Sequence, residues 1–445
     1  MISTALVTRN RVAGVVGLTV LVATVLSWRA KEFSSPTQQL STQQLSIFDV
    51  PALRGVVEAG KSNLSFVGTA VEWWRLEYED GYAQAAARHY NLITMTNDCK
   101  WSYLDEYNFS RCDAGLEFAS AQQMGFRFHT LLWMRGGNPA WLDESLASAD
   151  ADKKQQYLHD HVANTVSRYS RAGVVAYDVI NEAVCDFGYM EYTRRDVDGR
   201  WVASQEDCFF SKYYNATLKI SDWYSGNDPV DDYETVIDDA FRQARLFDPD
   251  ALLCLNDYQD ESASGFEHRK SDNIYALVRG MLERGVPIDC VGIQTHVDLG
   301  YNDRRNWYPG EYANYQRLQD LGLRIMVTEF EARCTNMGVP CKEWDLDAET
   351  TQAELYAKGT RLCQQFPACM SFTTWGFTDA ASHSNTDGRY GNRHPLPFDE
   401  NFDAKPAYFA LFETLSSPKT PLIIDDDAAP AVPINDNNDI NPTTA

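Results

Sequence analysis

The feature that most constrains the fold is an alternation of short apolar segments with longer amphipathic segments, repeated eight times along the chain. The apolar segments cover residues 64–71, 92–96, 126–133, 174–180, 251–256, 288–296, 324–329 and 370–375. The helix-like segments cover residues 82–89, 114–124, 153–169, 233–247, 272–284, 312–321, 350–365 and 405–415. Strands that alternate with helices form parallel sheets, and such strands are apolar because both of their faces are buried. Eight such pairs predict an α/β fold, a single-domain (β/α)8 barrel over residues 50–415.

An open, doubly wound sheet can be built from the same alternation. Nucleotide-binding sheets of that kind carry a glycine-rich turn after the first strand, and no such turn follows residues 64–71. At 445 residues, the chain also has the length of one barrel with insertions. The closed barrel is therefore the favoured arrangement.

The N-terminal residues carry the pattern of a targeting segment. Arg9 and Arg11 precede an apolar run over residues 12–28, and further basic residues follow it. Residues 1–31 are therefore predicted to be either a cleaved signal peptide or a membrane anchor through residues 12–28, and both alternatives stay open. Either one predicts a barrel that is secreted, or anchored to a membrane of the secretory pathway and facing the lumen or the outside.

Three other segments differ in composition from the barrel. Residues 32–49 are rich in Ser, Thr and Gln and predict a flexible linker. Residues 416–445 are acidic and rich in proline and predict a disordered tail. Residues 185–228 show no clear helical pattern after the fourth strand, and a loop of this length at the mouth of a barrel is usually functional.

The cysteines also indicate an oxidising compartment, since the chain has 10 of them. Four pairs lie close enough in sequence for short disulfide loops: Cys99 with Cys112, Cys185 with Cys208, Cys334 with Cys341, and Cys363 with Cys369. Cys254 and Cys290 lie inside strand-like segments, so we expect buried free thiols there. Three glycosylation sequons, at Asn63, Asn108 and Asn215, point to the same compartment.

The net charge limits the partners. With 39 basic and 63 acidic side chains, the formal net charge is −24. A surface of this kind repels nucleic acid and anionic lipid, but it tolerates a neutral polymer. The chain has 11 Trp and 23 Tyr. We expect most of these rings to pack in the core, but such flat rings can also stack on the apolar faces of sugars.

Two glutamates follow apolar strands at the rim where a barrel places its active site. The fourth apolar segment leads into Asn181-Glu182, and the seventh ends at Thr328-Glu329. A lone glutamate at a strand end is usually a surface or capping residue. Two of them at one rim match the paired carboxyl groups that cleave a glycosidic bond, one as proton donor and the other as nucleophile or base. Glu182 and Glu329 are therefore the candidate catalytic residues.

Other strand ends carry amide, imidazole, ammonium, phenol and indole groups, which suit the hydroxyls and apolar faces of sugars. These candidate substrate-binding residues are Asn97, Lys100, His129, Trp133, Asn181, Tyr258, Gln294, His296 and Trp375. Because carboxyl groups and water suffice for hydrolysis, we expect no metal and no cofactor. We also expect a monomer.

The ordered set of motifs resembles glycoside hydrolase family 10, the xylanase family of (β/α)8 barrels, from about Phe66 to Leu415. The motifs that carry the resemblance are Gly68-Thr69-Ala70, Asn97 with Lys100-Trp101, His129-Thr130-Leu131 with Trp133, Asp178-Val179-Ile180-Asn181-Glu182-Ala183, Asn256-Asp257-Tyr258, Gly292-Ile293-Gln294-Thr295-His296, Thr328-Glu329, Trp375-Gly376 and Lys405-Pro406-Ala407-Tyr408. The pair Cys363 and Cys369 also resembles a disulfide of fungal members.

The resemblance implies a retaining endo-1,4-β-xylanase-like mechanism. Glu182 is then the acid/base and Glu329 the nucleophile, with carboxyl groups about 5–5.5 Å apart. Asn181 resembles the residue that binds the sugar 2-hydroxyl, and His296 the partner that orients the nucleophile. The glycone-side set of the family corresponds to Asn97, Lys100, His129, Trp133, Gln294 and Trp375.

Four positions depart from the family pattern. Thr96 stands where a glutamate usually precedes the asparagine, and His383 stands where a tryptophan usually follows a serine. Met134 replaces a frequent histidine, and Glu331 replaces the aspartate that supports the nucleophile's histidine, with one methylene more. Two alternatives therefore stay open beside a xylanase: a barrel hydrolase on another β-glycan, and a carbohydrate-binding protein without turnover.

Overall fold

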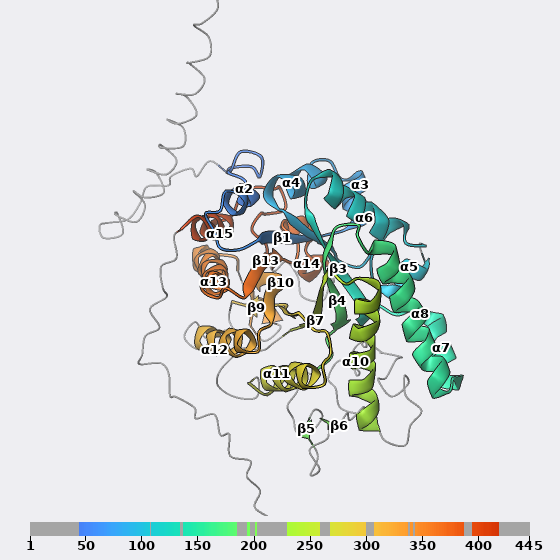
Figure 1. Cartoon of the computed structure of the whole chain (residues 1–445). Helices are drawn as coiled ribbons and strands as arrows, with labels where there is room; N and C mark the ends of the chain where they lie inside the picture. Colours follow the sequence, from blue (N-terminus) through green and yellow to red (C-terminus); the bar gives the residue numbers. More distant parts are fainter. Residues whose placement is uncertain are drawn as a thin grey trace, which may run out of the picture. The chain divides into compact units, whose positions relative to one another are not determined.

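The computed structural model describes residues 44–106, 108–133, 137–184, 194–195, 201–202, 229–258, 268–299, 307–336, 339–340, 343–386 and 394–417. Parallel strands lie at the centre of this part of the chain, and helices surround them (Figure 1). The central strands are β1 (Phe66–Val71), β2 (Leu92–Met95), β3 (Gly125–Trp133), β4 (Val174–Asn181), β7 (Leu252–Asp257), β8 (Cys290–Ile293), β10 (Arg324–Arg333) and β13 (Cys369–Thr374). Each of them coincides with one of the eight apolar segments.

The sheet closes on itself. Its strand order is β13-β1-β2-β3-β4-β7-β8-β10, and β10 pairs in turn with β13. All of these pairings are parallel. The predicted (β/α)8 barrel is therefore confirmed, and the residues that follow the strands gather at one rim.

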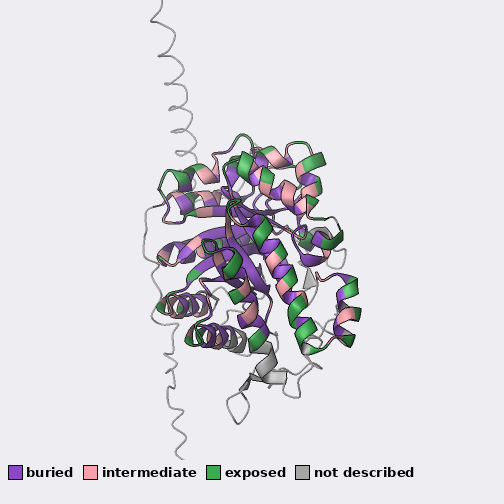
Figure 2. Cartoon of the chain, turned by 45° about the vertical axis from the view of Figure 1, so that its right-hand side comes forward, coloured by how far each residue is buried: buried purple, intermediate pink, exposed green. Residues whose placement is uncertain are grey.

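The eight predicted helices are also present, with shifted ends. They are α4 (Tyr82–His89), α6 (Ser110–Ala121), α8 (Ala151–Tyr169), α10 (Pro229–Phe247), α11 (His268–Glu283), α12 (Trp307–Asp320), α13 (Leu346–Gln365) and α15 (Pro406–Ser416). Asp150 and Asp345 cap α8 and α13, because their carboxylates accept the backbone N–H groups of Lys153 and Ala348. Figure 2 shows the strands buried and the helices buried on one side only.

Short elements lie outside the eight strand–helix pairs. They are α2 (Leu53–Glu58), α3 (Trp73–Tyr78), α5 (Trp101–Glu106), α7 (Ala140–Ser148), β5 (Arg194–Arg195), β6 (Trp201–Val202), β9 (His296–Asp298), β11 (Thr335–Asn336), β12 (Val339–Pro340), η2 (Asp379–Ala381) and α14 (His383–Thr386). Most of them follow barrel strands, at the rim where barrel enzymes place their sites. The long connection predicted over residues 185–228 is described only at β5 and β6, which pair antiparallel.

Two strand predictions differ from the structure around the seventh strand. β10 continues beyond Glu329 to Arg333, because Glu331, Ala332 and Arg333 pair with β9 above the barrel. The apolar segment 288–296 is interrupted at Thr295, whose φ is 59°. This turn redirects the chain from β8 into β9, and it places His296 opposite Glu331.

The core has two parts. A large cluster fills the space between strands and helices. A small cluster consists only of strand residues, as expected for a layer inside the barrel: Leu92, Ala176, Cys254, Cys290 and Met326.

One prediction about the cysteines is wrong. Cys254 and Cys290 are not free thiols but form a disulfide, and their Cα atoms are 4.5 Å apart. They lie directly opposite each other on β7 and β8. Their 36-residue separation hides this proximity in the sequence, since only strand pairing creates it.

The other predicted disulfides have different outcomes. Cys99–Cys112 and Cys363–Cys369 are present. Cys334 is disulfide-bonded, and its predicted partner, Cys341, lies outside the described residues. The predicted pair Cys185–Cys208 lies wholly outside them.

The barrel begins before residue 50. Residues from Leu45 belong to its unit, and Ile47 and Val50 are fully buried. The N–H of Ile47 donates to the Phe402 carbonyl at 2.7 Å. The end of the expected linker, 32–49, is therefore part of the folded unit, which the structure extends to Leu45.

The predicted signal or anchor, residues 1–31, and nearly all of the predicted tail, 416–445, lie outside the described residues. Within the part of the chain that is described, no helix is both long and apolar enough to cross a membrane.

Candidate active site

Glu182 is the first residue after β4, and its backbone turns sharply there. Its φ is 53°, and its N–H donates to the Asn256 carbonyl on the next strand at 2.8 Å. A non-glycine residue in this left-handed region carries a backbone strain of about 1–2 kcal/mol. Its carboxylate accepts hydrogen bonds from Trp133 Nε1 at 3.0 Å and from Gln294 Nε2 at 3.2 Å.

Glu329 lies within β10 and is only 4% exposed. Its Oε1 accepts from Asn256 Nδ2 at 2.9 Å, and its Oε2 lies 3.2 Å from His296 Nε2. Burial raises the pKa of this carboxyl, but the hydrogen bond from His296 and the nearby His129 and Arg127 outweigh it and lower the pKa to about 2. Glu329 is therefore held as a carboxylate.

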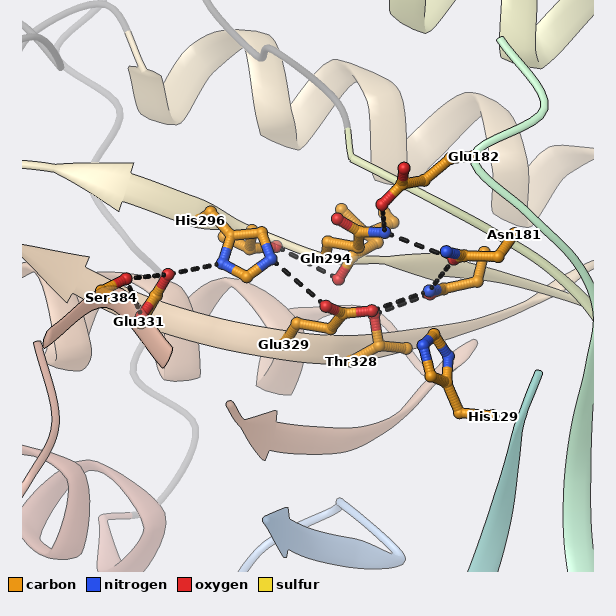
Figure 3. Close-up of polar contacts among 12 residues, drawn as sticks. His129, Asn181, Glu182, Gln294, His296, Thr328, Glu329, Glu331 and Ser384 are labelled. Atoms are coloured by element: carbon orange, nitrogen blue, oxygen red, sulfur yellow. Dashed lines mark hydrogen bonds and ion pairs between the residues drawn. The ribbon is translucent and has the colours of Figure 1, made fainter. Parts of the chain in front are cut away.

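Three amides join the two glutamates (Figure 3). Asn181 Oδ1 accepts from Asn256 Nδ2 at 2.8 Å, and Gln294 Nε2 lies 3.4 Å from the same oxygen. Thr328 Oγ1 donates to Asn256 Oδ1 at 2.8 Å, which fixes the orientation of that amide. A continuous polar cluster thus links Glu182 and Glu329 across β4, β7, β8 and β10.

Gly292 makes room for this cluster. A Cβ at this position on β8 would lie 2.3 Å from Asn256 Oδ1 and 2.9 Å from Thr328 Cγ2. Any larger residue would therefore displace Asn256 from both Asn181 and Glu329.

The imidazole of His296 bridges two carboxylates. Its Nε2 faces Glu329, and its Nδ1 lies 2.8 Å from Glu331 Oε1. Burial lowers the pKa of this ring, but hydrogen bonds to Glu329 and Glu331 outweigh burial and raise the pKa to about 9. The ring is therefore an imidazolium at neutral pH. The longer Glu331 does reach His296.

Glu331 is itself held firmly. It is 2% exposed, and both of its oxygens lie within 3.0 Å of Ser384 Oγ. Burial raises the pKa of this carboxyl, while His296, Arg333 and Ser384 outweigh burial and lower the pKa to about 2. Two carboxylates with a cation between them thus form one unit beside the amides.

A second charged network lies beneath Glu329. His129 Nδ1 is 2.8 Å from Asp178 Oδ2, and Arg127 forms an ion pair with the same carboxylate. Arg127 and Asp178 are fully buried, and Arg127 Nη1 also donates to the Thr328 carbonyl at 3.3 Å. The neighbouring His129 and Arg127 both lower the pKa of Glu329.

The second and third strands contribute a separate group. Lys100 Nζ donates to Asn97 Oδ1 at 2.8 Å and lies 4.4 Å from the centre of the Trp133 ring. Burial lowers the pKa of the Lys100 ammonium, against the opposing effect of Glu329 and Glu182. Because Trp133 also contacts Glu182, this group is continuous with the glutamate pair.

Trp375 follows β13 and approaches the site from the eighth strand. Its ring centre lies 5.5 Å from that of His129 and 6.5 Å from that of His296, edge-on in both cases. Tyr258 follows β7 at the same rim and is partly exposed.

Two other departures from the family pattern, Thr96 and His383, lie in connections that follow barrel strands. Thr96 Oγ1 points back to the Val71 carbonyl at 3.4 Å. His383 begins α14 and is exposed. Met134 lies outside the described residues.

Five residues that support the site were not among the predicted site residues: Asn256, Thr328, Arg127, Asp178 and Ser384. Asn256, Thr328 and Asp178 stand in the motifs of the family pattern, but no role at the site was predicted for them. A charged residue inside an apolar strand is the signal that could have found Arg127 and Asp178. Ser384, which lies in a connection, offers no comparable signal.

One other group could offer metal ligands among the described residues. Ligand atoms of Asp379, His394 and Glu400 lie within 4.8 Å of one another. The Lys405 ammonium, 2.9 Å from Asp379 Oδ2, already supplies a positive charge to this group.

Comparison with known proteins identifies the family. The family model described as "Glycosyl hydrolase family 10" matches residues 56–414. The chain belongs to glycosyl hydrolase family 10. It is therefore a glycoside hydrolase, and its closed barrel is the fold of the solved family member described below.

Curated and solved members of the family include close relatives. Endo-1,4-beta-xylanase B of Thermotoga neapolitana is 31% identical over 376 residues, 82% of this chain and 92% of the relative. Xylanase 10B of Thermotoga maritima is 30% identical, with a TM-score of 0.64 over 82% of this chain and 98% of that one. Xylanase 10B of Thermotoga petrophila RKU-1, solved in complex with xylobiose, is 29% identical, with a TM-score of 0.65 over 86% and 98%.

Proposed function

We propose that this family 10 enzyme is an endo-acting β-1,4-xylanase that works by double displacement, with Glu329 as the nucleophile and Glu182 as the acid/base. The observation that carries the assignment of roles is the difference between the two environments. Glu329 is buried and held ionised by the His296 imidazolium, whereas Glu182 is partly exposed and, among the described residues, is hydrogen-bonded to two neutral donors, Trp133 and Gln294.

The first step breaks the glycosidic bond. Glu329 attacks the anomeric carbon while Glu182 gives a proton to the departing oxygen, so a glycosyl ester forms on Glu329. In the second step, Glu182 takes a proton from water, the water attacks the same carbon, and Glu329 leaves. Two inversions retain the configuration. The amides of Asn181 and Gln294 lie between the carboxylates and are oriented to bind sugar hydroxyls there (Figure 3).

The substrate class rests on the relatives and on the binding groups. The relatives named above are xylanases, and one was solved with xylobiose. Asn97, Lys100 and Trp133 offer an amide, an ammonium and an indole on one side of the glutamates, and Trp375 adds another indole. These groups suit a linear neutral polysaccharide.

Disulfides support a location outside the cytosol. Three are present in the described residues, and disulfides persist in oxidising compartments. We therefore assign the enzyme to the extracellular side, where its polymeric substrate lies.

Azide tests the two roles directly. Wild type, Glu182→Ala and Glu329→Ala are compared on an aryl β-xylobioside with a good leaving group. Azide can replace water in the second step of Glu182→Ala and should give the β-glycosyl azide, because Glu329 still acts as nucleophile. In Glu329→Ala, azide can attack only the intact substrate and should give the α-anomer. The same anomer from both variants would contradict the roles.

A panel of polysaccharides tests the substrate. Wild type should release short oligosaccharides from xylan in preference to mannan, cellulose and mixed-linkage glucan. Preference for another β-glycan would instead implicate Thr96 and His383, where this chain departs from the family pattern. Binding without products from every glycan would overturn the proposal.

A further inference from the structure

The contact between Ser384 and Glu331 joins the last connection of the barrel to the nucleophile's support. Ser384 Oγ lies 3.0 Å from Oε1 and 2.9 Å from Oε2 of Glu331, and Ser384 is 3% exposed. The other close partner of Glu331 is His296 Nδ1 at 2.8 Å, while Arg333 Nη1 lies at 3.7 Å. Figure 3 shows the four groups in a row: Ser384, Glu331, His296 and Glu329.

The serine is fixed from its own side. Its backbone N–H donates to Ser382 Oγ at 3.1 Å, and Ser382 is fully buried. This bond fixes the backbone of Ser384 and so holds its side chain beside Glu331.

Glu331 needs such an anchor for a geometric reason. Glu329 and Glu331 are two residues apart on β10, so their side chains leave the same face of the strand. A glutamate has one more rotatable bond than an aspartate, and it can place its carboxylate in more positions. A second hydrogen bond opposite His296 selects one of them.

We propose that Ser384 is a positioning residue for the nucleophile: its hydroxyl fixes the Glu331 carboxylate, which in turn holds the His296 ring against Glu329. This inference rests on the proposed role of Glu329. It explains how the chain accommodates a glutamate at position 331, and it couples α14 to the reacting end of the site.

The first test compares two serine-to-alanine variants. Ser384→Ala removes the hydroxyl from Glu331. Ser371→Ala is the matched control, because Ser371 is equally buried in β13 and its hydroxyl has no hydrogen-bond partner in the described part of the chain. On the aryl β-xylobioside, kcat of Ser384→Ala should fall about tenfold with KM nearly unchanged, since the loss affects the transition state. Ser371→Ala should match wild type.

The second test asks whether Ser384 acts through Glu331. In a double-mutant cycle, Ser384→Ala should lower kcat in the wild-type background but not in the Glu331→Ala background. An equal loss in both backgrounds would mean that the serine acts elsewhere, and this would overturn the proposal.

The third readout does not depend on activity. Histidine ¹³Cε1 resonances, with that of His296 assigned from a His296→Asn variant, report the pKa of the ring. In Ser384→Ala this pKa should fall from about 9 toward the ordinary value of about 6.5. An unchanged pKa would refute the positioning role. If the pKa falls but wild type does not cleave the xylobioside, the positioning role stands and the proposed substrate fails.

Discussion

His296 favours the ionised form of Glu329, the proposed nucleophile, because its ring lies between two buried carboxylates. Glu329 and Glu331 both have a pKa lowered to about 2, and the ring between them has a pKa raised to about 9. Between these values the group carries two negative charges and one positive charge. Glu329 is therefore ready to attack over a wide range of pH, although it is buried.

Removing the imidazolium should move the acidic limit of activity. In His296→Ala, burial still raises the pKa of Glu329, but the hydrogen bond from His296, which is the largest effect that lowers this pKa, is lost. Because Glu329 must be ionised to attack, the acidic limb of kcat/KM should shift to higher pH, and its maximum should fall about 100-fold. The pH profile is measured on the aryl xylobioside, for which protonation of the leaving group matters least.

His159→Ala is the control for this profile. His159 pairs with Asp239 between α8 and α10, and in the described part of the chain its hydrogen bond is to this carboxylate and not to a site residue. Its profile should superimpose on that of wild type. An acidic limb that stays at its wild-type pH in His296→Ala would show that His296 does not set the charge of Glu329.

At this scale, the sequence points to the proposed catalytic residues more clearly than to the residues that support them. Glu182 and Glu329 stand out because each is a charged residue at the end of an apolar run. Ser384 and Glu331 are 53 residues apart, and Arg127 and Asp178 are 51 apart. Their pairing depends on strand register and loop path, which a pattern of apolar residues does not specify.

The elements themselves follow closely from the apolar pattern. Every predicted strand and helix exists, because burial on both faces of a strand, or on one face of a helix, leaves a clear periodicity. The ends are less predictable. β10 extends to Arg333 because its last residues pair in parallel with β9, and this contact between distant segments is not visible in the local pattern. The disulfide between β7 and β8 was missed for the same reason.

Lys405 shows how one side chain can hold a connection between elements. It precedes α15, and its ammonium donates to Asp379 Oδ2 at 2.9 Å and to the carbonyls of His394 and Leu396 at 2.7 and 2.6 Å. Burial raises the pKa of Asp379 to about 6, against the lowering effect of Lys405. The connection after β13 is thus tied to the start of the last helix.

Removing one member of the Lys405–Asp379 ion pair should lower the stability of the folded chain. Lys405→Met leaves Asp379 buried without its partner, and we expect the free energy of unfolding at pH 7 to fall by about 3–5 kcal/mol. Because protonation of Asp379 removes the unpaired charge, the loss should be smaller at pH 5 than at pH 7. Denaturant unfolding measures both values. The double variant Asp379→Asn with Lys405→Met should recover part of the loss, and a double variant no more stable than the single one would contradict this account.

On the scale of the whole molecule, the closed barrel turns separate sequence motifs into one site. Strand ends from residues 97 to 375 meet at one rim because the eight barrel strands are parallel and β13 pairs with both β1 and β10. The net charge is also a property of the whole chain and not of the site.

A formal charge of −24 repels any anionic polymer that approaches the rim.

Salt should therefore distinguish two forms of the proposed substrate. Long-range repulsion reaches about 30 Å at 0.01 M salt but only about 8 Å at 0.15 M. On a xylan that bears uronic acid groups, kcat/KM should rise several-fold when salt is raised over this range, because screening removes the barrier to approach. On a neutral arabinoxylan, kcat/KM should stay nearly constant, since an uncharged polymer is not repelled by the net charge of the enzyme. Initial rates on both polymers, at matched viscosity and fixed pH, provide the comparison. An equal response of the two substrates would show that net charge does not govern their approach, and that local contacts at the rim decide the rate.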